Sequence, residues 1–334
     1  MRRLDECTRT AAWIAEQVKE HWPDAVVNLG DTFDSHSSID VPSLCTGVRI
    51  MNTVMKACKS VAARFVIIPG NHDAYSRDYS ALEAFQGIGA DVAWKPTVYD
   101  DIFGAMPYCK SAEMATTWLK DLESKCHLTL VHLDVQGASY FSGYDSDVGI
   151  DPEEFEGPIY GGHYHHPHTI GPIELIGSVM HHNFTDSVRK GAARGILVLE
   201  VDDEGNVVSE ERIANPHTTI YHKVNWTKEK AQIKTIRLYG KFPKRMHLRV
   251  QCEIAKVKEV KEEIAERFPE LLSLAVIGMS DQTQEIKREA TVHVDANPED
   301  AIDAYVKNKG VPKGLDKDEL LALGKEFLND VVVG

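Results

Sequence analysis

The sequence predicts a layered α/β domain followed by a smaller α+β domain. Helical patterns alternate with short buried-strand patterns through residue 131, polar side chains directly follow several of those strands, and the composition changes after about residue 225. A chain of 334 residues that is 43% hydrophobic is long enough for one large domain and a smaller one. The alternation of helix and strand indicates a largely parallel sheet in the first domain.

The expected elements follow from hydrophobic spacing. In residues 7–20, apolar side chains recur at helical intervals, and Pro23-Asp24 ends the pattern before a short apolar strand. A composition of Asp, Glu, Gly and Asn predicts a hairpin turn over residues 202–206. In the first domain we expect helices over 7–20, 43–62, 79–87 and 111–124, strands over 25–29, 65–68, 91–94, 97–99, 102–105, 127–131, 173–177 and 195–201, and a loop over 137–150.

The second domain is predicted from its own set of patterns. Residues 256–268 form a Lys/Glu-rich amphipathic helix, and Asn297 and Asp316 are expected to cap two further helices. The expected elements are strands over 246–252, 272–277 and 289–294 and helices over 256–268, 298–308 and 316–329.

The composition limits which cellular compartment and which binding partners we expect. We find no apolar run of about 18 residues and no secretory leader, so we expect a cytoplasmic protein without a membrane span. The six cysteines form no CxxC pair and are expected to be reduced thiols. A net charge of −14 is unusual for a protein that grips nucleic acid by itself. Any DNA contact should therefore be local, metal-assisted or shared with another subunit.

A histidine-rich stretch stands out at residues 160–168 (YGGHYHHPH), where imidazoles could bind a metal or could simply decorate a surface loop. Three other polar signals also follow predicted strands: Gly30-Asp31, Gly70-Asn71-His72-Asp73 and His132. Each alone could be a turn, a cap or a core histidine. Together they predict a shared site, since ligand loops converge at the carboxyl ends of strands. This mixture of oxygen and imidazole ligands suits Mn, Fe or Zn more than Mg alone.

The series GDxxD, GNHD, strand-end His and GHxH resembles the calcineurin-type metallophosphoesterases. Within this superfamily, the chain resembles the SbcD type, the phage recombination endonuclease subunits and their eukaryotic meiotic-recombination counterparts. The features that carry this resemblance are the GHYHHPH form, the trailing Ile176-Gly177-Ser178 and the additional C-terminal domain. The resemblance covers residues 5–225. It implies a β-sandwich flanked by helices over residues 1–225 and a small α+β capping domain with terminal helices over residues 226–334.

The resemblance also implies roles for individual residues. Two divalent metal ions, most typically Mn with Fe, Zn or Mg as alternatives, would be bridged by Asp31. His72 would act at the scissile phosphate as the catalytic residue, with Asp73 orienting its ring and Asp34 supporting the site from behind. Asn71, His132 and His163 would complete the second metal site and His165 would bind the first, while the roles of His166, His168, His181 and His182 stay open.

The chain departs from the family at its start. The family opens with a strand ending in an Asp-x-His motif that supplies two ligands to the first metal, and no Asp-x-His occurs here before Gly30. The first site should therefore be weakened, and loss of a central strand should leave backbone groups and apolar surface uncovered. Truncation and a natural variant are the two explanations, and we favour truncation.

The leading functional hypothesis is a metal-dependent DNA exo- or endonuclease subunit of a recombination or repair complex, in a bacterial or phage-infected host cytoplasm. The resemblance implies an SbcC-type coiled-coil ATPase as partner and a homodimer, for which residues 42–62 are one candidate interface. Their apolar face could equally pack within the chain. The alternatives are a small-molecule phosphodiesterase or phosphatase of the same superfamily, and a catalytically degenerate subunit that binds DNA or the partner.

Overall fold

The computed structural model describes residues 3–35, 38–73, 80–141, 144–186, 193–226, 246–269, 271–279 and 321. The chain divides into two compact units, Met1–Gly278 and Met279–Gly334, and the fold below is that of the first. Apart from residue 321, the predicted strand 289–294 and helices 298–308 and 316–329, with the expected caps Asn297 and Asp316, lie outside the described residues.

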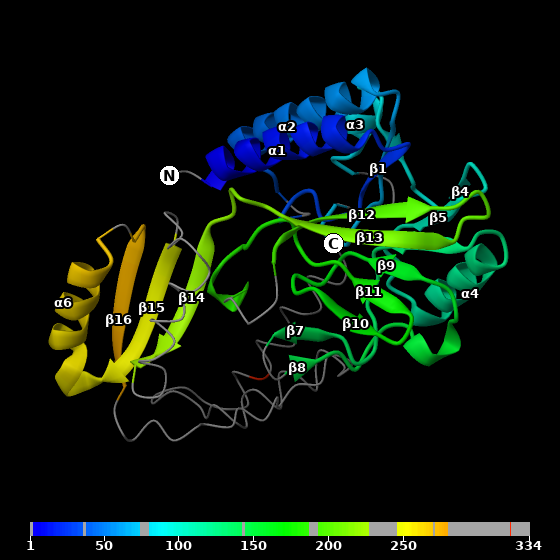
Figure 1. The fold of residues 1–334 in the computed structure, drawn as a ribbon. Coiled ribbons are helices and arrows are strands. Elements are labelled where there is room, and N and C mark those ends of the chain that lie inside the picture. The colour runs from blue at the N-terminus through cyan, green and yellow to red at the C-terminus, as the bar shows by residue number, and fades with distance from the viewer. Residues whose placement is uncertain are drawn as a thin grey trace. The chain divides into compact units, whose positions relative to one another are not determined.

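The first sheet is parallel, and helices cover its outer face (Figure 1). Its central strand carries a continuous apolar run that is buried, as expected for a strand covered on both faces. Side chains from three helices form a core against that sheet. The sheet has the order β1 (Ala25–Asn28), β2 (Arg64–Ile67), β3 (Asp91–Val92), and its helices are α1 (Arg3–His21), α2 (Val41–Ser60) and α3 (Glu83–Gln86).

Local chemistry sets where these helices begin. The Asp40 side chain accepts a hydrogen bond from the Ser43 N–H, and Pro42 occupies the first turn of α2, where no intrahelical donor is needed. The apolar face of α2 packs against α1 and the sheet, so the part of residues 42–62 considered for a dimer interface is largely covered within the chain. The predicted homodimer stays a prediction.

A second, six-stranded sheet is parallel at its centre and antiparallel at both ends. Helix α4 (Ala112–Glu123), capped by the Ser111 side chain, packs on its outer face with a buried apolar cluster. The strand order is β10 (His168–Ile170), β11 (Ile173–Leu175), β9 (Ile159–Gly161), β6 (Leu128–Val131), β5 (Phe103–Met106), β4 (Thr97–Tyr99).

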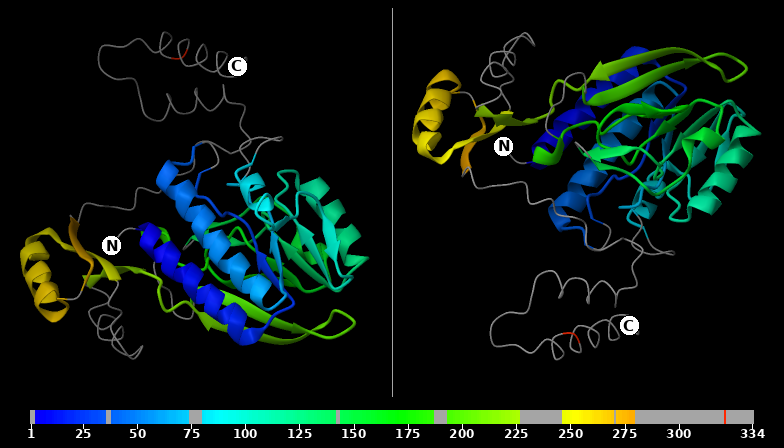
Figure 2. Two further views of the ribbon diagram at one scale, coloured as in Figure 1. Left: turned by 90° about the horizontal axis from the view of Figure 1, so that it is seen from above. Right: turned by 90° about the horizontal axis from the view of Figure 1, so that it is seen from below.

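A shared core lies between the two sheets. It combines Val66 and Ile68 at β2 with Leu128 and Leu130 of β6, and the hairpin β12 (Gly195–Val201) and β13 (Val207–Ala214) packs against it. The views in Figure 2 show α1 and α2 on one side of this arrangement and α4 on the other. The first unit is thus a mixed α/β fold of several sheets, and the predicted turn at residues 202–206 does join an antiparallel hairpin.

Strand β1 is the least covered strand of the first sheet. All four of its residues are only partly buried, whereas three of the four β2 residues are buried. Within the described residues, β1 pairs with β2 alone and β12 pairs with β13 alone. Strand β1 is therefore an edge strand of the described sheet, with partly buried side chains.

A small separate layer follows, with β14 (Ile220–Asn225), β15 (Met246–Glu253) and β16 (Ser273–Met279) covered by α6 (Val257–Arg267). Strand β14 lies before the predicted domain boundary at 225, yet it pairs with β15 in parallel. The predicted loop 137–150 contains two short antiparallel strands, β7 (Ser139–Phe141) and β8 (Tyr144–Asp145). All six cysteines are free thiols. No helix in the described part of the chain has the length and apolarity to cross a membrane.

Candidate metal centre

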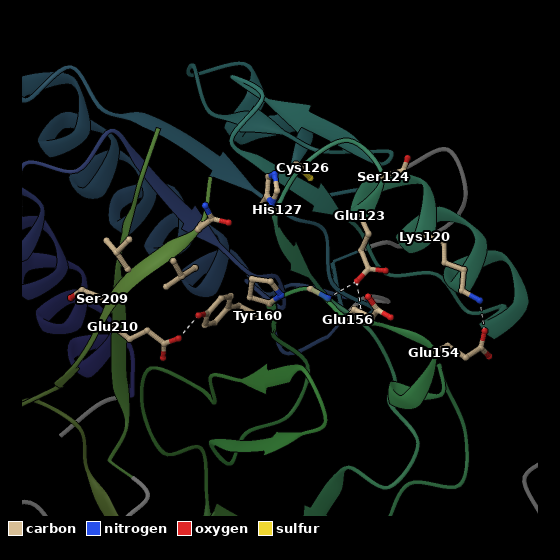
Figure 3. A pocket seen from close by; sticks show the side chains of 15 residues that line it. Lys120, Glu123, Ser124, Cys126, His127, Glu154, Glu156, Tyr160, Ser209 and Glu210 are labelled. Carbon is tan, nitrogen blue, oxygen red and sulfur yellow. Dashed lines mark hydrogen bonds and ion pairs between the residues drawn. The ribbon is translucent and has the colours of Figure 1, made fainter. Parts of the chain in front are cut away.

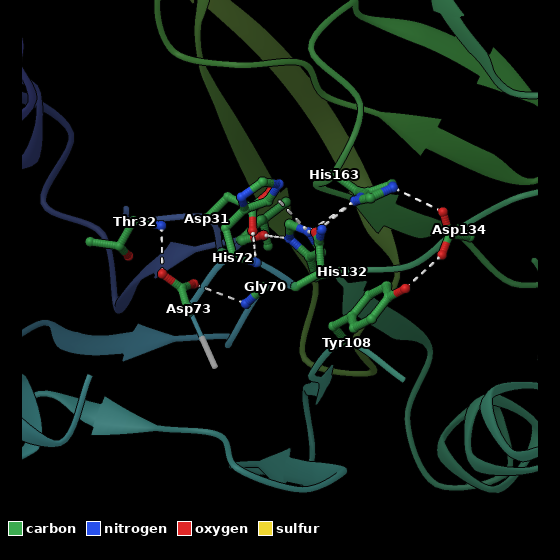
Figure 4. A network of polar contacts seen from close by, with 12 residues as sticks. Asp31, Thr32, Gly70, His72, Asp73, Tyr108, His132, Asp134 and His163 are labelled. Atoms are coloured by element: carbon green, nitrogen blue, oxygen red, sulfur yellow. Dashed lines mark hydrogen bonds and ion pairs between the residues drawn. The ribbon is translucent and has the colours of Figure 1, made fainter. Parts of the chain in front are cut away.

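Four of the five predicted metal ligands meet at one place (Figure 4). Asp31 follows β1 and Asn71 follows β2, so the first sheet supplies two of them. His132 follows β6 and His163 follows β9 in the second sheet. Parallel strands end at the same edge, which is why loops far apart in the sequence converge here.

The potential ligand atoms lie close together. Asn71 Oδ1 is 3.1 Å from His132 Nε2 and 3.0 Å from His163 Nδ1. The two ring nitrogens are 3.2 Å apart, and Asp31 Oδ2 is 3.4 Å from His132 Nε2. We call this group of Asp31, Asn71, His132 and His163 the four-ligand cluster.

Neighbouring acceptors determine the proton positions on both rings. His132 Nδ1 is 2.6 Å from the Leu29 carbonyl oxygen, which can only accept, so Nδ1 carries the proton. His163 Nε2 is 2.9 Å from Asp134 Oδ1, and that carboxylate likewise requires a donor. In their neutral forms, both rings therefore present a lone pair to the centre of the four-ligand cluster.

This donor set fits a divalent cation. A carboxylate oxygen, an amide oxygen and two imidazole lone pairs face one another without a proton of their own to share. Ligand atoms about 2.1 Å from a tetrahedral ion lie about 3.4 Å apart, which is close to the separations found here. The residues fit a borderline divalent metal such as Mn, Fe or Zn, whose identity the geometry leaves open.

The pKa values of His132 and Asp31 are shifted by their contact with each other. Burial opposes protonation of His132, but its hydrogen bond and charge interaction with Asp31 outweigh burial and raise its pKa. Burial opposes ionisation of Asp31, and the same contacts with His132 lower its pKa in spite of it. Each of these two groups thus favours the charged form of the other.

Glycines allow the loops to approach so closely. Gly30 has φ +95°, and a Cβ there would lie 2.4 Å from His132 Nδ1. A Cβ at Gly162 would lie 2.3 Å from the Leu29 carbonyl oxygen, the group that accepts from His132. Any larger side chain at either position would displace the ring or its acceptor.

Sequence reasoning missed Asp134, which supports His163 from behind. Its carboxylate accepts hydrogen bonds from Tyr108 at 3.0 Å and Tyr140 at 2.6 Å in addition to His163. Burial opposes its ionisation, but the hydrogen bonds from His163 and Tyr140 prevail and lower its pKa to about 2. Its position two residues after His132, at the same strand end, was the available signal.

The loop after β2 places His72 beside the four-ligand cluster. Its backbone N–H donates to Asp31 Oδ1 at 3.0 Å, and its ring Nδ1 lies 2.9 Å from the Asp34 carbonyl oxygen. Asp34 contacts His72 through its backbone carbonyl, and the supporting role expected of its side chain stays a prediction. The catalytic role of His72 stays a prediction.

Asp73 differs from the arrangement expected for it, in which it would orient the His72 ring. Its Oδ1 accepts from the N–H groups of Thr32 and Phe33, and its Oδ2 accepts from the Gly70 N–H. Burial raises the pKa of Asp73 to about 6, against the effect of the Gly70 hydrogen bond. Asp73 therefore ties the loop after β1 to the loop after β2, because three backbone donors there need an acceptor.

His165, expected to share the first metal with Asp31, lies instead in a second group of side chains. Its Nδ1 is 3.0 Å from Asp186 Oδ1, and its ring stacks on His182 with centroids 4.5 Å apart. Burial and the charges of His165 and Arg3 lower the pKa of His182 to about 4, against the opposite influence of Asp186 and Asp34. We call His165, His182 and Asp186 the second cluster.

His166 of the loop and His181 lie beside a buried arginine. Arg194 is 2% exposed, and its Nη2 lies 3.2 Å from His166 Nδ1 while its Nε lies 3.4 Å from His181 Nδ1. Burial and the Arg194 charge lower the pKa of His181 to about 4. His168 accepts from the Ser139 N–H, so it has a structural role.

A cavity of about 880 Å³ lies elsewhere, between the end of α4, β9 and β13 (Figure 3). Three of its four carboxylates have partners: Glu154 pairs with Lys120, Glu123 accepts from backbone N–H groups of the 156–157 loop, and Glu210 accepts from Tyr160.

A mixed α/β domain with oxygen and imidazole ligands at the ends of its strands has the construction of a metal-dependent hydrolase. Residues 5–167 match the family model described as calcineurin-like phosphoesterase. The chain therefore carries a calcineurin-like phosphoesterase domain over these residues, which places that domain in the metallophosphoesterase superfamily. A comparison with curated proteins gives no match.

Proposed function

We propose that the chain is a metal-dependent phosphodiesterase that cleaves DNA, acting as the nuclease subunit of a complex with an SbcC-type coiled-coil ATPase. The observation that supports phosphodiester hydrolysis is the four-ligand cluster, in which the ligand atoms of Asn71, His132 and His163 lie 3.0–3.2 Å apart and Asp31 lies 3.4 Å from His132. A cation held there supplies positive charge that stabilises the phosphoryl oxygens and makes water more nucleophilic at neutral pH.

The chain's own groups account for substrate orientation and proton transfer. The Asp31 carboxylate accepts a hydrogen bond from the backbone N–H of His72. This bond holds the His72 imidazole next to the proposed metal ligand Asp31. With its Nδ1 proton donated to the Asp34 carbonyl, His72 in its imidazolium form can give the Nε2 proton to the leaving oxygen. Leu29 and Asp134 keep the two imidazole lone pairs directed at the cation.

The choice of DNA as substrate is supported by the resemblance. The GHYHHPH form and the small layer of β14, β15 and β16 after the phosphoesterase domain are features of the SbcD type. A net charge of −14 weakens unaided binding to a polyanion. In this proposal, the metal, the ATPase subunit and a second copy of the chain therefore supply much of the attraction for DNA.

The test compares two substrates in Mn²⁺ and in EDTA: linear double-stranded DNA and bis-p-nitrophenyl phosphate. We expect Mn²⁺-dependent cleavage of both, loss of both in His163→Ala, and a 10²–10⁴-fold slower reaction in His72→Ala with metal binding retained. His127→Ala is the matched control and should match the wild type, because this exposed histidine precedes β6, at the end of that strand opposite to His132.

The outcomes separate the candidate functions. Hydrolysis of the small diester without cleavage of DNA would refute the nuclease assignment and support a small-molecule phosphodiesterase. Metal binding without hydrolysis of either substrate would support a catalytically degenerate subunit. Failure to bind metal at all would refute the role given to the four-ligand cluster.

A further inference from the structure

The second cluster joins His165, which the resemblance already implies as a metal ligand, to two side chains that the phosphoesterase match does not cover. The ligand atoms of His165, His182 and Asp186 all lie within 4.8 Å of one another. His182 and Asp186 lie beyond residues 5–167, the part of the chain that matches the family. Two of the three side chains are therefore features of this chain that need their own explanation.

We propose that His165, His182 and Asp186 bind a divalent transition-metal ion of their own, beside the four-ligand cluster. Two imidazoles and one carboxylate form a three-ligand set that leaves a coordination position open, which suits Zn, Mn, Fe or Co better than Mg. The proposal concerns metal binding alone, so it goes beyond the proposed hydrolysis and does not depend on any substrate.

One carboxylate oxygen of Asp186 faces the imidazole of His165. Its side chain is 1% exposed, and its Oδ2 accepts the His182 backbone N–H at 2.7 Å, which shapes the turn over residues 182–186. Its Oδ1 faces His165 Nδ1 at 3.0 Å. That separation is near the spacing of about 3.4 Å between two ligands of one tetrahedral ion, so a small opening would admit a metal between them.

The ring nitrogens of His182 are the third candidate ligand group. It is partly buried and stacks on His165 with an angle of 23° between the rings. Among the described residues, neither of its ring nitrogens has a hydrogen-bond partner. Its ring nitrogens are therefore free to act as ligands. Coordination of a cation would satisfy one nitrogen.

The surroundings are compatible with a cation. The carboxylate of Asp34 acts electrostatically on His182, and the Asp34 carbonyl contacts His72, whose N–H binds Asp31. The second cluster therefore adjoins the four-ligand cluster through Asp34. Two positive charges lie nearby: Arg3 acts on His182 and pairs with Glu6, and Arg194 has guanidinium nitrogens close to His181 and His166.

A simpler arrangement makes a different prediction. If Asp186 only orients the His165 ring through Nδ1, as carboxylates often orient a ligand histidine, then His182 has no part in binding. Removal of the His182 ring therefore discriminates between the two arrangements, and its ring has no hydrogen bond in the described structure whose loss would disturb the fold.

The experiment titrates the EDTA-treated chain with Co²⁺, following heat and the visible absorption that reports cobalt coordination. We expect two equivalents for the wild type and for His127→Ala, and one equivalent each for His182→Ala, Asp186→Asn and His163→Ala. Asp186→Asn keeps an acceptor for the His182 N–H, and circular dichroism checks that each variant is folded. If Asp186→Asn fails to fold, His182→Ala decides.

Two results would overturn the proposal: retention of both equivalents in His182→Ala, or a single wild-type equivalent that His163→Ala removes. A single wild-type equivalent lost in His182→Ala but kept in His163→Ala would support the second cluster and refute the four-ligand cluster. Because the readout is cobalt binding, failure of hydrolysis with two equivalents bound would count against the proposed function alone.

Discussion

At the scale of single residues, the proton positions on two histidines decide what the four-ligand cluster can bind. The Leu29 carbonyl holds the proton of His132 on Nδ1, and Asp134 holds that of His163 on Nε2. Both remaining nitrogens thus become lone pairs 3.2 Å apart. A backbone oxygen and a carboxylate behind the ligands are therefore as important for metal binding as the ligands.

Asp134→Asn should weaken metal binding without unfolding the chain. The amide no longer demands a proton from His163 Nε2, so the ring can rotate or change tautomer and lose its lone pair at the centre. We expect the affinity of the four-ligand cluster for Mn²⁺ or Co²⁺ to fall 10–100-fold. Calorimetric titration measures this, with the exposed Asp147→Asn as control, and an unchanged affinity would contradict the role of Asp134.

The sequence pattern predicted the candidate ligands better than the residues that hold those ligands in position. Asp31, Asn71, His132 and His163 could be gathered from the sequence because each follows a strand, and strand ends meet. Asp134 follows the same strand as His132, but its contact with His163 depends on a distance across the fold that the sequence does not give. His165 illustrates the limit, because its position in the motif predicts a shared site with Asp31 whereas its contacts are with Asp186.

At the scale of elements, long amphipathic patterns were predictable and short polar strands were not. The predicted helices 43–62, 111–124 and 256–268 correspond to α2, α4 and α6 with small differences at their ends. Strands β7, β8 and β10 have only two or three residues each, too few to show an alternating pattern. Strand β14 was missed because its place in a sheet comes from pairing with β15.

The small layer should be stabilised by the apolar face of α6. Ile264 and Val260 are fully buried against β15. Ile264→Ala should destabilise this layer by about 2–5 kcal/mol, since it removes buried methyl groups and leaves a cavity. Urea unfolding followed by hydrogen exchange in β15 measures the loss, with the exposed Glu262→Ala as control. Equal exchange in β15 of the variant and the wild type would contradict the packing role of Ile264.

At the scale of the whole first unit, the four-ligand cluster joins the two sheets. Asp31 and Asn71 come from strands of the first sheet, and His132 and His163 come from strands of the second. The apolar core between the sheets holds them together in the body of the unit. At the strand ends, the polar side chains of the four-ligand cluster take the place of that core. Without a cation, hydrogen-bond acceptors from the two sheets lie close together there with no positive metal ion between them.

A bound metal should therefore stabilise the folded first unit as a whole. A ligand that binds only the folded state at 100 times its dissociation constant adds about 2.7 kcal/mol to the free energy of unfolding. For a unit of this size, that corresponds to a rise in Tm of roughly 5–10 °C. Thermal unfolding in Mn²⁺ and in EDTA measures the difference for the wild type, for His127→Ala and for His163→Ala.

The increase in Tm should appear in the wild type and in His127→Ala and should be much smaller in His163→Ala, which removes a ligand contributed by the second sheet. Addition of excess EDTA after Mn²⁺ should return the wild type to its metal-free Tm, because the stabilisation is an equilibrium effect of binding. An identical Tm with and without Mn²⁺ would contradict the bridging role. A full increase in His163→Ala would show instead that the metal is bound without the second sheet's histidine.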